Sequence, residues 1–585
     1  MTATNRALRL ASVGLALAVG CAAPLAPSTG RAAARSPAYA KQGMVASSQA
    51  DATRAGVAIL KAGGNAVDAA VATAFALGVA QPYSTGIGGG GFLLIRLASG
   101  EIVAVDARET APAAADRDMY VRPGVPEQAS LAGPLAVATP GMVAGLALVL
   151  ERYGTLSLVE VMAPAIHLAD EGFAIGPVHA RMLERMRGYG MPDRFPETGR
   201  IQFPPPGTPS EPGWRLVQTD LARTLTTIAQ GGPDAFYRGP IADAIADAMQ
   251  KDGGLVTRAD LAAYRPVLRE PVRGTYRGYE VWSFPPPSSG GAILIEMLNI
   301  LEGFDLASRG AGSSASLHPI AEAMKLAFAD RAAWFGDPDF VEVPVARLTA
   351  KPYAAQLRAR INPAWWRRAP WTWTADETAI RVRGAGLPLD DSGTAHFSVT
   401  DAVGNVVAMT GTVNTPFGSG VTVPGTGIVL NNEMDDFAKA PNAPNVYGLV
   451  DTRGANAVAP GKRPLSSMTP TILLQGGRPT MVTGSPGGPR IITTVLLSIL
   501  NVIDYGMDVQ ASVSAPRFHH QWVPDKLFVE PAIPVEVIDG LRRRGHHVEV
   551  SPGDWSSAQA IVIEPETGWH LGGSDPRSDG LALGF

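Results

Sequence analysis

The chain changes its sequence pattern abruptly at Thr394, and this change limits the folds it can adopt. Residues 384–393 are rich in glycine, proline and aspartate, which predicts a loop. Polar and apolar residues then alternate over 394–400, Gly404-Asn405 turns the chain, and residues 406–413 return as a second strand. We therefore expect an antiparallel hairpin that starts at Thr394 and opens a sheet-rich C-terminal part.

The chain before this boundary alternates predicted helices with short strands, as in an α/β (α+β) protein. Two consecutive helices follow Ser47, and Asn65 with Asp68 resembles a capping box at the start of the second. The glycine-rich loop 85–91 leads into a strand rather than a helix and contains no lysine, so it is not a nucleotide-binding P-loop. A long helix is predicted over 318–335.

Composition and charge exclude several classes of protein. Of the 585 residues, 46% are hydrophobic and 17% are charged, which supplies a large core and argues against global disorder. The formal net charge is -4, so the chain is not a strongly basic nucleic-acid binder. A single cysteine, Cys21, excludes an intrachain disulfide framework and any zinc cluster built from cysteines.

Common catalytic signatures are missing from the sequence. The nine histidines do not fall at a spacing typical of metal ligands, and no serine lies in a G-x-S-x-G motif. We interpret the adjacent pairs His519-His520 and His546-His547 as packing or surface residues. No metal site is therefore expected, and attention turns to Gly393-Thr394.

The first residues have the pattern of an export signal. Two arginines precede an apolar stretch over 10–20 that is short for a membrane span. The sequence LAVGC ending at Cys21 resembles a bacterial lipobox, which would place a lipid on Cys21, whereas the alanines at 32–34 could serve an ordinary signal peptidase. In both cases we expect a signal peptide, taken as residues 1–21, and a protein that is periplasmic or anchored to the membrane as a lipoprotein.

Thr394 is the candidate nucleophile. If the bond before it were cut, its hydroxyl would attack a carbonyl carbon and its own α-amine would act as the base. An α-amine titrates at about pH 8, so it is largely available as a base near neutral pH, unlike a lysine. A threonine after a glycine also begins many ordinary strands, so the spacing alone leaves a structural alternative open.

Four segments of the C-terminal part follow one another in a recognisable order: TAHFSV at 394–399, NNEMDDF at 431–437, KRPLSSM at 462–468 and GSPGG at 484–488. Together they resemble the small subunit of a γ-glutamyltransferase (γ-glutamyl transpeptidase, or glutathione hydrolase). In the first half, DARETAP at 106–112 resembles the arginine segment of that family, and residues 322–340 resemble its long helix. The resemblance covers residues 43–585.

This resemblance implies an N-terminal-nucleophile hydrolase fold, an αββα sandwich in which two stacked sheets lie between helical layers. It implies autocleavage between Gly393 and Thr394 into a large subunit (22–393) and a small catalytic subunit (394–585) that remain together as a heterodimer. Gly393 suits this event, because a residue without a Cβ can adopt strained dihedrals and leaves its carbonyl open to attack. The resemblance implies no metal or organic cofactor.

The implied substrates, glutathione and other γ-glutamyl compounds, carry an α-carboxylate that calls for a guanidinium fork and hydroxyl donors. The resemblance assigns Arg108 as the fork and Ser466 and Ser467 as the hydroxyl donors. The alternatives are a structural salt bridge of Arg108 with Glu109 or Asp106, and a simple polar turn at the two serines.

The α-ammonium of the same substrates calls for an acidic partner and neutral acceptors. The resemblance assigns Asp436 as the acidic partner, with Glu433 and Asn414 beside it. If this segment were a strand, Asp435 would face away from Asp436. An acidic run of this kind would otherwise be interpreted as a solvated loop.

The remaining assignments concern the transition state and the pocket entrance. Gly487 and Gly488 precede an apolar helix and can offer backbone N–H groups to an oxyanion. By resemblance, Thr412 orients the nucleophile, and Tyr447 lies in a segment, 441–449, that is similar to the lid loop of the family. A simple turn at the glycines and a surface aromatic at Tyr447 are the alternatives.

We therefore expect an exported γ-glutamyltransferase, or glutathione hydrolase, that passes a γ-glutamyl group from Thr394 to water or to an amino-acid or peptide acceptor. The nearest alternative is a cephalosporin acylase of the same family, but its glutaryl substrate lacks the ammonium that Asp436 would bind. A catalytically silent binding relative is the other alternative. Ala395 stands where the bacterial pattern more often has a second threonine, which puts any role of a second hydroxyl in doubt.

Overall fold

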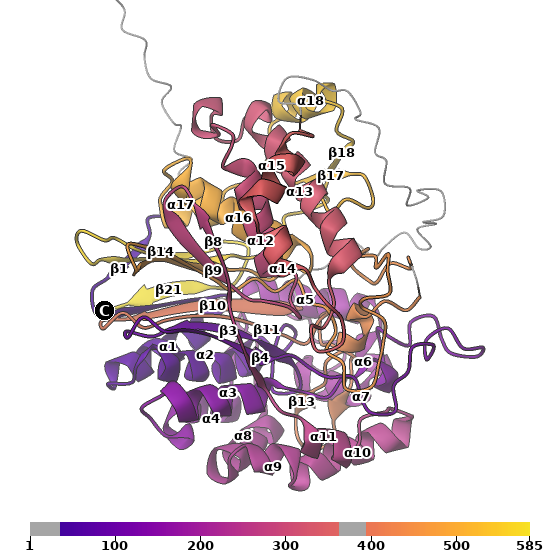
Figure 1. Ribbon diagram of the computed structural model, residues 1–585. Coiled ribbons are helices and arrows are strands. Elements are labelled where there is room, and N and C mark those ends of the chain that lie inside the picture. Colours follow the sequence, from indigo (N-terminus) through magenta and orange to yellow (C-terminus); the bar gives the residue numbers. More distant parts are fainter. Residues whose placement is uncertain (1–34, 362–392, 441) are drawn as a thin grey trace, which may run out of the picture. The chain divides into compact units, whose positions relative to one another are not determined.

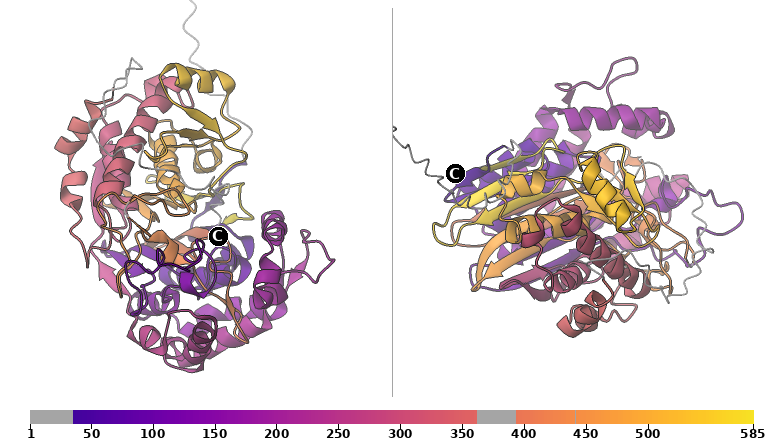
Figure 2. Two further views of the ribbon diagram at one scale, coloured as in Figure 1. Left: turned by 90° about the vertical axis from the view of Figure 1, so that its right-hand side faces the viewer. Right: turned by 90° about the horizontal axis from the view of Figure 1, so that it is seen from above.

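The computed structural model describes residues 35–361 and 393–585, with the exception of residue 441. In this part of the chain two seven-stranded sheets lie face to face, and helices cover the outer face of each sheet (Figure 1). Figure 2 shows the same arrangement from two further sides. Neighbouring strands within both sheets are antiparallel.

The spatial order of the strands in each sheet differs from their order along the chain. The first sheet contains β1 (Ala38–Ala40), β20 (His570–Ser574), β19 (Gln559–Ile563), β15 (Arg478–Gly484), β14 (Thr471–Gln475), β9 (Tyr279–Ser283) and β8 (Val272–Tyr276). The second sheet contains β21 (Leu581–Gly584), β2 (Gly43–Ser47), β10 (Thr394–Asp401), β11 (Val406–Thr412), β3 (Gly90–Arg96), β4 (Ile102–Ala107) and β7 (Val267–Arg269).

Two helical layers enclose the sheets. The helices α1 (Ala50–Lys61), α2 (Ala66–Ala80) and α3 (Met142–Tyr153) pack against the second sheet, α4 (Leu158–Glu171) packs on α2, and α8 (Thr219–Gly231) packs on α4. The helices α12 (Gly290–Leu301), α16 (Arg490–Ile503) and α17 (Val509–Ser514) pack against the first sheet, and α13 (Ser314–Trp334) packs on α12. This αββα sandwich confirms the fold that the family resemblance implied.

Shorter elements complete the described part of the chain. The further helices are α5 (Pro177–Gly188), α6 (Met191–Arg194), α7 (Pro196–Gln202), α9 (Pro233–Tyr237), α10 (Pro240–Asp252), α11 (Arg258–Ala263), α14 (Val345–Leu348), α15 (Lys351–Arg358) and α18 (Val535–Arg543). The further strands are β5 (Phe173–Ala174), β6 (Arg215–Leu216), β12 (Thr422–Val423), β13 (Ile428–Val429), β16 (Phe518–His519), β17 (Leu527–Val529) and β18 (Val548–Val550). Among the described residues, no helix has the length and apolar content that crossing a membrane requires.

Both sheets combine strands from before and after Thr394. In the second sheet β10 lies between β2 and β11, where Thr394 is opposite Thr412 and Phe397 is opposite Ser47. In the first sheet β14 and β15 lie between β9 and β19. Because each sheet is built from both parts of the chain, a cut before Thr394 would leave two chains that share one core.

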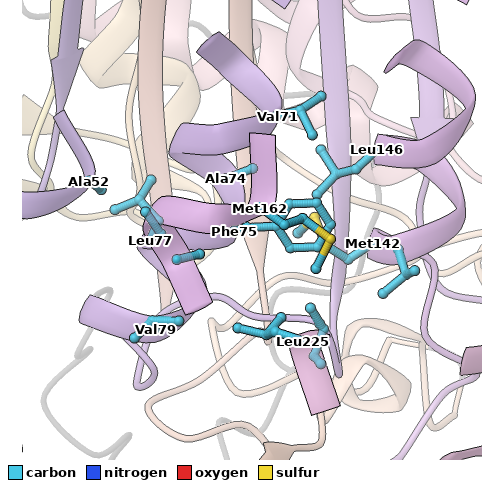
Figure 3. Close-up of a cluster of buried hydrophobic side chains, with 14 of the residues drawn as sticks. Ala52, Val71, Ala74, Phe75, Leu77, Val79, Met142, Leu146, Met162 and Leu225 are labelled. Atoms are coloured by element: carbon cyan, nitrogen blue, oxygen red, sulfur yellow. The ribbon is translucent and has the colours of Figure 1, made fainter. Parts of the chain in front are cut away.

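The helical layer beneath the second sheet has an apolar interior that the sequence of α2 explains. Nearly every residue of α2 is alanine, valine, leucine or phenylalanine, and a helix that is apolar all round is buried all round. Phe75 of α2 lies among Met142 and Leu146 of α3 and Met162 of α4 (Figure 3). This packing holds the second sheet, and therefore β10, on a rigid base.

The alternating pattern of β10 does not mark a face exposed to solvent, because every residue of the strand is buried. The apolar residues face the core between the second sheet and α2, and the polar residues are hydrogen-bonded inside the protein. His396 contacts Thr410 Oγ1 at 2.9 Å, and Ser398 donates to the carbonyl oxygen of Gln559 at 3.1 Å. Period-two alternation here separates an apolar core from a polar layer between two sheets, not a core from solvent.

The predicted elements correspond closely to those of the structure. The hairpin after Thr394 is confirmed, with β11 ending at Thr412, one residue before the predicted end. The helix expected from Ser47 onward begins at Ala50, because Ser47 ends β2 and Gln49 caps the helix by accepting the N–H groups of Asp51 and Ala52. The capping box is confirmed: the side chains of Asn65 and Asp68 each accept a backbone N–H from the other, at 3.0 and 2.8 Å.

Candidate active site

Thr394 begins the central strand β10, and its hydroxyl is held by a chain of hydrogen bonds. Its Oγ1 lies 3.0 Å from Oγ1 of Thr412. The Thr412 hydroxyl donates its single proton to the carbonyl oxygen of Gly393 at 3.0 Å, so Thr394 is the donor between the two threonines. Thr412 Oγ1 also accepts the N–H of Asn414 at 2.7 Å. These bonds fix the Thr394 hydroxyl beside the carbonyl group that precedes it.

The glycine before Thr394 is required by close packing. A Cβ added to Gly393 would lie 2.1 Å from the carbonyl oxygen of Asn414 and 2.5 Å from Cα of Thr415, which no side chain could tolerate. This lack of space is a second reason for a glycine at this position, beside the freedom of its dihedrals. The hydrogen bond from Thr412 polarises the Gly393 carbonyl, which makes its carbon a better target for a hydroxyl.

A buried group of charges, which we call the charge cluster, lies next to the two threonines. Its cation is Arg108, which directly follows β4 and is 1% exposed. The guanidinium lies 2.5 Å from Glu433 and 3.6 Å from Glu109, and it forms a short hydrogen bond with Asp436. Its Nε donates to the carbonyl oxygen of Pro464 at 3.2 Å. Three carboxylates therefore surround one guanidinium.

These carboxylates cannot all be ionised in a buried space at low cost. Burial raises the pKa of Glu109 to about 8 and raises the pKa values of Glu433 and Asp436, in each case against the pull of Arg108. Burial also disfavours the Arg108 cation, but the three carboxylates outweigh it and raise the pKa of Arg108. The charge cluster thus favours an additional positive charge, such as an ammonium group.

The structural alternative for Arg108 has only limited support. Asp106 accepts the backbone N–H of Arg108 at 2.9 Å, but its carboxylate pairs with the guanidinium groups of Arg269 and Arg463 at 2.7 and 3.3 Å. Glu109 is the more distant member of the charge cluster. The close partners of the Arg108 side chain are the two residues that sequence reasoning assigned to the substrate ammonium.

The acidic segment is not a strand, and that part of the sequence argument is wrong. Glu433–Asp436 forms a 3₁₀ helix (η3), in which successive side chains are rotated by about a third of a turn. Asp435 still points away from Arg108, and it accepts hydrogen bonds or an ion pair from Ser130 Oγ, Val446 N–H and Lys439 Nζ at 2.6, 3.0 and 3.0 Å. Asp436 is therefore the aspartate of the charge cluster, and the segment is buried rather than solvated.

Sequence reasoning missed a second buried arginine. Arg331 of α13 donates to Ser289 Oγ at 3.0 Å and to Ser467 Oγ at 3.3 Å, and Ser289 also holds the carbonyl oxygen of Ser466 at 2.9 Å. Burial lowers the pKa of Arg331 to about 10, and Asp436 opposes that change. In the part of the chain that the structure describes, no carboxylate forms an ion pair with Arg331. The signal available in the sequence was a positively charged residue within a predicted helix of mostly apolar residues.

Tyr447 closes the site from the side of the predicted lid segment. It is 6% exposed, and its hydroxyl donates to the carbonyl oxygen of Asn414 at 2.8 Å. A Cβ added to Gly488 would lie 2.7 Å from the Tyr447 ring, so glycine is needed there for contact as well as for its φ of 52°. Gly487 has a φ of 134°, and its carbonyl oxygen accepts the N–H of Arg490 at the start of α16. The surface-aromatic alternative for Tyr447 is wrong.

Two cavities meet at Thr394. The inner cavity has a volume of about 20 Å³, enough for roughly one water molecule. The sequence-predicted residues that border it are Arg108, Thr394, Thr412, Asn414, Glu433, Asp436, Tyr447, Ser466, Ser467 and Gly488. The outer cavity has a volume of about 370 Å³ and is bordered by Arg181, Arg185, Arg577, Tyr83 and Trp555 among others. Of the predicted lining residues, Gly487 alone does not border the inner cavity.

The departure at Ala395 does not disturb this arrangement. Ala395 is 1% exposed and belongs to the apolar core between the second sheet and α2. Neighbouring residues of a strand point to opposite faces, so this position lies on the other face from the Thr394–Thr412 pair.

A threonine at the head of a central strand, with its hydroxyl beside the preceding carbonyl in an αββα sandwich, defines an N-terminal-nucleophile hydrolase. Residues 52–585 match the family model described as Gamma-glutamyltranspeptidase. The chain belongs to the gamma-glutamyltranspeptidase family.

Individual relatives support this assignment over the whole described part. The chain is 48% identical over 553 residues to the "Glutathione hydrolase proenzyme" of Escherichia coli strain K12, covering 94% of this chain and 93% of that protein. It is 42% identical over 560 residues to the "Acylase ACY 1 proenzyme" of Pseudomonas sp. strain SE83, covering 94% of each. The crystal structure of a cephalosporin acylase from Bacillus halodurans superposes with a TM-score of 0.80 at 32% identity, covering 96% of this chain and 99% of that one.

Proposed function

We propose that the chain is a γ-glutamyltransferase and glutathione hydrolase, made as one precursor that cuts itself between Gly393 and Thr394. The observation that carries the proposal is the charge cluster beside the Thr394 hydroxyl. A γ-glutamyl group ends in an α-carboxylate and an α-ammonium, and a site that reads both needs a guanidinium and carboxylates at one place. The similarity to glutathione hydrolase proenzymes supports the same activity.

The first reaction is the maturation of the chain itself. The Thr394 hydroxyl oxygen attacks the carbonyl carbon of Gly393, the peptide C–N bond breaks, and the released amine takes up the hydroxyl proton. Water then hydrolyses the resulting ester between the two residues. The products are a C-terminal carboxylate on Gly393 and a free Thr394 that carries both its hydroxyl and an α-amine. The shared sheets hold the two chains together.

The second reaction is acyl transfer from a γ-glutamyl amide. The α-amine of Thr394 accepts the hydroxyl proton as the oxygen attacks the γ-carbonyl carbon, and it returns that proton to the leaving amine. Backbone N–H groups at Gly487 and Gly488 stabilise the oxyanion, and Thr412 orients the nucleophile. Water or an acceptor amine then attacks the γ-glutamyl ester, which releases glutamate or a new γ-glutamyl compound and restores Thr394.

Binding of the γ-glutamyl head group proceeds by exchange of charges. In the structure Arg108 is bound to Glu433 and Asp436, and the inner cavity is too small for the head group. The substrate α-carboxylate replaces these partners on Arg108, assisted by Ser466 and Ser467. The substrate α-ammonium then compensates the two carboxylates that Arg108 has released. A zwitterion can make this exchange without leaving a buried charge unpaired.

The leaving group lies on the outer side of Thr394. Cysteinylglycine, the leaving group of glutathione, ends in a carboxylate, and the outer cavity presents basic side chains. Arg577 is committed to Glu530 and Asp575 at 2.7 and 3.1 Å. Arg181 of α5 is exposed, and no carboxylate among the described residues forms an ion pair with it. Arg181 is therefore the side chain that attracts the carboxylate of the leaving dipeptide or of a peptide acceptor.

A glutaryl acylase of the same family is the second candidate, supported by the similarity to the acylases. A glutaryl group has the terminal carboxylate but no ammonium. After such a substrate had taken Arg108, Glu433 and Asp436 would have no cation beside them and would have to bear an unpaired buried charge or take up protons. The acidic groups of the charge cluster therefore favour the γ-glutamyl substrate, whose ammonium replaces the lost cation.

Purified protein tests the proposal directly. A denaturing gel with intact-mass measurement is expected to show two fragments, the smaller one beginning at Thr394. The same preparation is expected to release glutamate from glutathione and p-nitroaniline from γ-glutamyl-p-nitroanilide, but to cleave the glutaryl analogue poorly. Preference for the glutaryl compound would select the acylase, and a cleaved protein that acts on neither would select the silent relative.

Export is part of the proposal and rests on the N-terminal sequence, which lies outside the described residues. Two positive charges and an apolar stretch precede Cys21. We propose a periplasmic protein or a membrane-anchored lipoprotein, in which the large subunit begins at Cys21 if it carries lipid and beyond the alanines at 32–34 if an ordinary signal peptidase cuts there. The intact mass of the large fragment from membrane and soluble fractions distinguishes lipid on Cys21 from ordinary signal cleavage. A fragment that retains Met1 in both fractions would refute export.

A further inference from the structure

A second group of ligating side chains lies where α13 meets the C-terminal part of the chain. His318 and Glu322 are four residues apart on α13, so they share one face of the helix. His546 reaches them from the turn before β18, and its Nε2 lies 2.7 Å from Nδ1 of His318. One ligand atom from each residue lies within 4.8 Å of the other two. In residues 35–361 and 393–585, apart from 441, this is the one such group of three.

We propose that His318, Glu322 and His546 form a binding site for a divalent cation of the zinc class. Zinc binds imidazole nitrogen and carboxylate oxygen at about 2.0–2.2 Å, and a tetrahedral arrangement places these atoms roughly 3.3 Å apart. The observed separations, from 2.7 Å up to 4.8 Å, need changes of no more than about 1.5 Å to reach that geometry. Side-chain rotation alone can supply such changes.

The two imidazoles are held inside the protein and face each other. His318 and His546 are 5% and 6% exposed. The contact between Nδ1 of His318 and Nε2 of His546 brings one ring nitrogen of each residue to a place where a single ion can reach both. The proton that joins these two nitrogens would move away when the ion binds, because a ligating nitrogen carries no proton.

The charges around the three ligands favour a cation. Glu322 and Asp525 supply two carboxylates, whereas Lys325 supplies one ammonium, at 3.0 Å from Glu322 and 3.6 Å from Asp525. His520 contacts Asp525 at 3.2 Å. A bound ion would compete with Lys325 for Glu322, and Asp525 lies close enough to keep Lys325 paired. These neighbours form the outer shell that orients metal ligands in proteins.

Solvent can reach the group from one side. A surface hollow of about 540 Å³ is bordered by His546 and by the exposed His547. The cations beside it, Lys526 and Arg542, are paired with Glu549 and Asp539 at 2.7 and 3.3 Å, so they do not repel an approaching ion strongly. Water from this hollow could supply the fourth ligand of a tetrahedral ion.

The position of the group indicates a structural consequence. The ion would join α13 to the segment that carries α18 and β18, which pack together in the upper part of Figure 1. Arg331 of the active site lies 13 residues further along α13, which is about 20 Å of helix. We therefore expect the ion to raise thermal stability and to leave the rate of acyl transfer nearly unchanged.

Sequence reasoning expected no metal ligands among the histidines. His318 and His546 are separated by 228 positions, and the third ligand is a glutamate, so no compact motif could show the group. His546 belongs to a histidine pair that was interpreted as packing or surface. The structure separates the two: His546 is buried against α13, and His547 is exposed.

The test uses the untagged mature protein, freed of metal with a chelator. Co²⁺ is expected to bind at one equivalent with the visible absorption of a tetrahedral ion, and Zn²⁺ is expected to displace it and to raise the melting temperature by at least about 2 °C. His546→Ala and Glu322→Gln should lose the absorption and the shift. Should His546→Ala fail to fold, Glu322→Gln, which keeps the shape of the side chain, carries the test alone.

The chain offers a matched control. His167 and Glu171 on α4 have the same spacing and lie 3.2 Å apart, but they are exposed and have no third ligand. His167→Ala and His547→Ala should bind Co²⁺ as the parent does. The proposal is overturned if the parent binds no Co²⁺ at one equivalent, or if the spectrum persists in Glu322→Gln or His546→Ala.

Discussion

The two cavities that meet at Thr394 hold their charges in opposite ways. In the inner cavity Arg108 is buried and paired with carboxylates of the chain itself, and the space left is about 20 Å³. In the outer cavity Arg181 is exposed to solvent, and the space is about 370 Å³. A ligand must replace existing ion pairs to enter the first but only displaces water from the second. Recognition should therefore be strict on the acyl side of Thr394 and tolerant on the leaving-group side.

Removing the nucleophile that the two cavities share should have the largest effect. Thr394→Ala is expected to remain one chain and to lose at least about a thousandfold in activity on every substrate, because neither the ester with Gly393 nor the γ-glutamyl ester can form. A denaturing gel and an assay with γ-glutamyl-p-nitroanilide measure both. Two fragments from purified Thr394→Ala would show that another agent cuts the chain.

Asp436→Ala should have the next largest effect, and it should depend on the substrate. The loss of one charge-assisted contact with the α-ammonium costs about 1.5–3 kcal/mol, which is more than tenfold in kcat/KM for γ-glutamyl-p-nitroanilide. The glutaryl analogue has no ammonium and should lose much less. Equal losses on the two substrates would assign Asp436 to the structure of the site rather than to the substrate.

Arg108→Lys tests the other half of the head group. A lysine retains the charge among the three carboxylates but cannot bind a carboxylate with two parallel hydrogen bonds. The variant should fold and mature. Its KM for the free-carboxylate donor should rise by roughly tenfold, because the loss of one contact with the α-carboxylate costs about 1.4 kcal/mol of binding free energy. A donor with an esterified α-carboxylate should react poorly with both proteins. An unchanged KM in matured Arg108→Lys would remove Arg108 from substrate binding.

The electrostatic strain of the inner cavity should be visible in thermal stability. The folded pKa of Glu109 is about 8, against an ordinary value of 4.5, so the folded chain retains a proton that the unfolded chain releases. This contribution to stability is complete below about pH 4.5 and is lost as the pH rises toward 8. Glu109→Gln cannot ionise and should flatten that decline.

Melting temperatures of the parent and Glu109→Gln at pH 4.5 and pH 8 measure the effect. We expect the difference between the two proteins to shift in favour of the variant by about 2–4 °C at pH 8, which corresponds to roughly 2–5 kcal/mol for a chain of this length. Glu184 provides a control, because it is almost unburied and hydrogen-bonded to Ser210, and its pKa is lowered rather than raised. Parallel melting curves for the parent and Glu109→Gln would show that Glu109 ionises in the folded chain as it does in water.

The sequence was sufficient where the signal is local or carried by family motifs. Period-two alternation predicted the hairpin at Thr394, and the capping residues predicted the start of α2. The site residues could be named only because their motifs resemble a known family, since Arg108 and Asp436 are 328 positions apart. The pairing of these two residues depends on how the sheets stack, and no spacing along the chain reveals it.

Other features could not be predicted from the sequence. Strand geometry does not separate Asp435 from Asp436, because the segment forms a 3₁₀ helix. At Gly393 the backbone of Asn414 and Thr415 leaves no space for a side chain. The first feature depends on the local backbone conformation, and the second depends on a contact with another segment of the chain. Arg331 was missed because its burial against Ser289 and Ser467 is also a tertiary property.

Arg181→Ala should have the smallest effect and is the most direct test of the outer cavity. An exposed ion pair contributes about 0.2–1 kcal/mol to binding, so its loss should change KM by no more than about fivefold. The KM for glutathione should rise by up to that factor, because the leaving dipeptide ends in a carboxylate. Hydrolysis of γ-glutamyl-p-nitroanilide should be unchanged, because its leaving group carries no carboxylate.

The acceptor reaction distinguishes a local contact from a general loss of positive charge near the site. In Arg181→Ala the KM for glycylglycine as acceptor should rise, whereas that for its uncharged C-terminal amide should not, and the difference should shrink as salt screens the exposed charge. Arg187→Ala is the matched control, since Arg187 lies on the same helix, is paired with Glu184 at 3.8 Å and does not border the outer cavity. If Arg187→Ala changes the glutathione KM as much as Arg181→Ala does, the leaving group responds to the net charge of α5. If neither changes it, the outer cavity does not read the carboxylate, and tolerance on that side of Thr394 comes from open space alone.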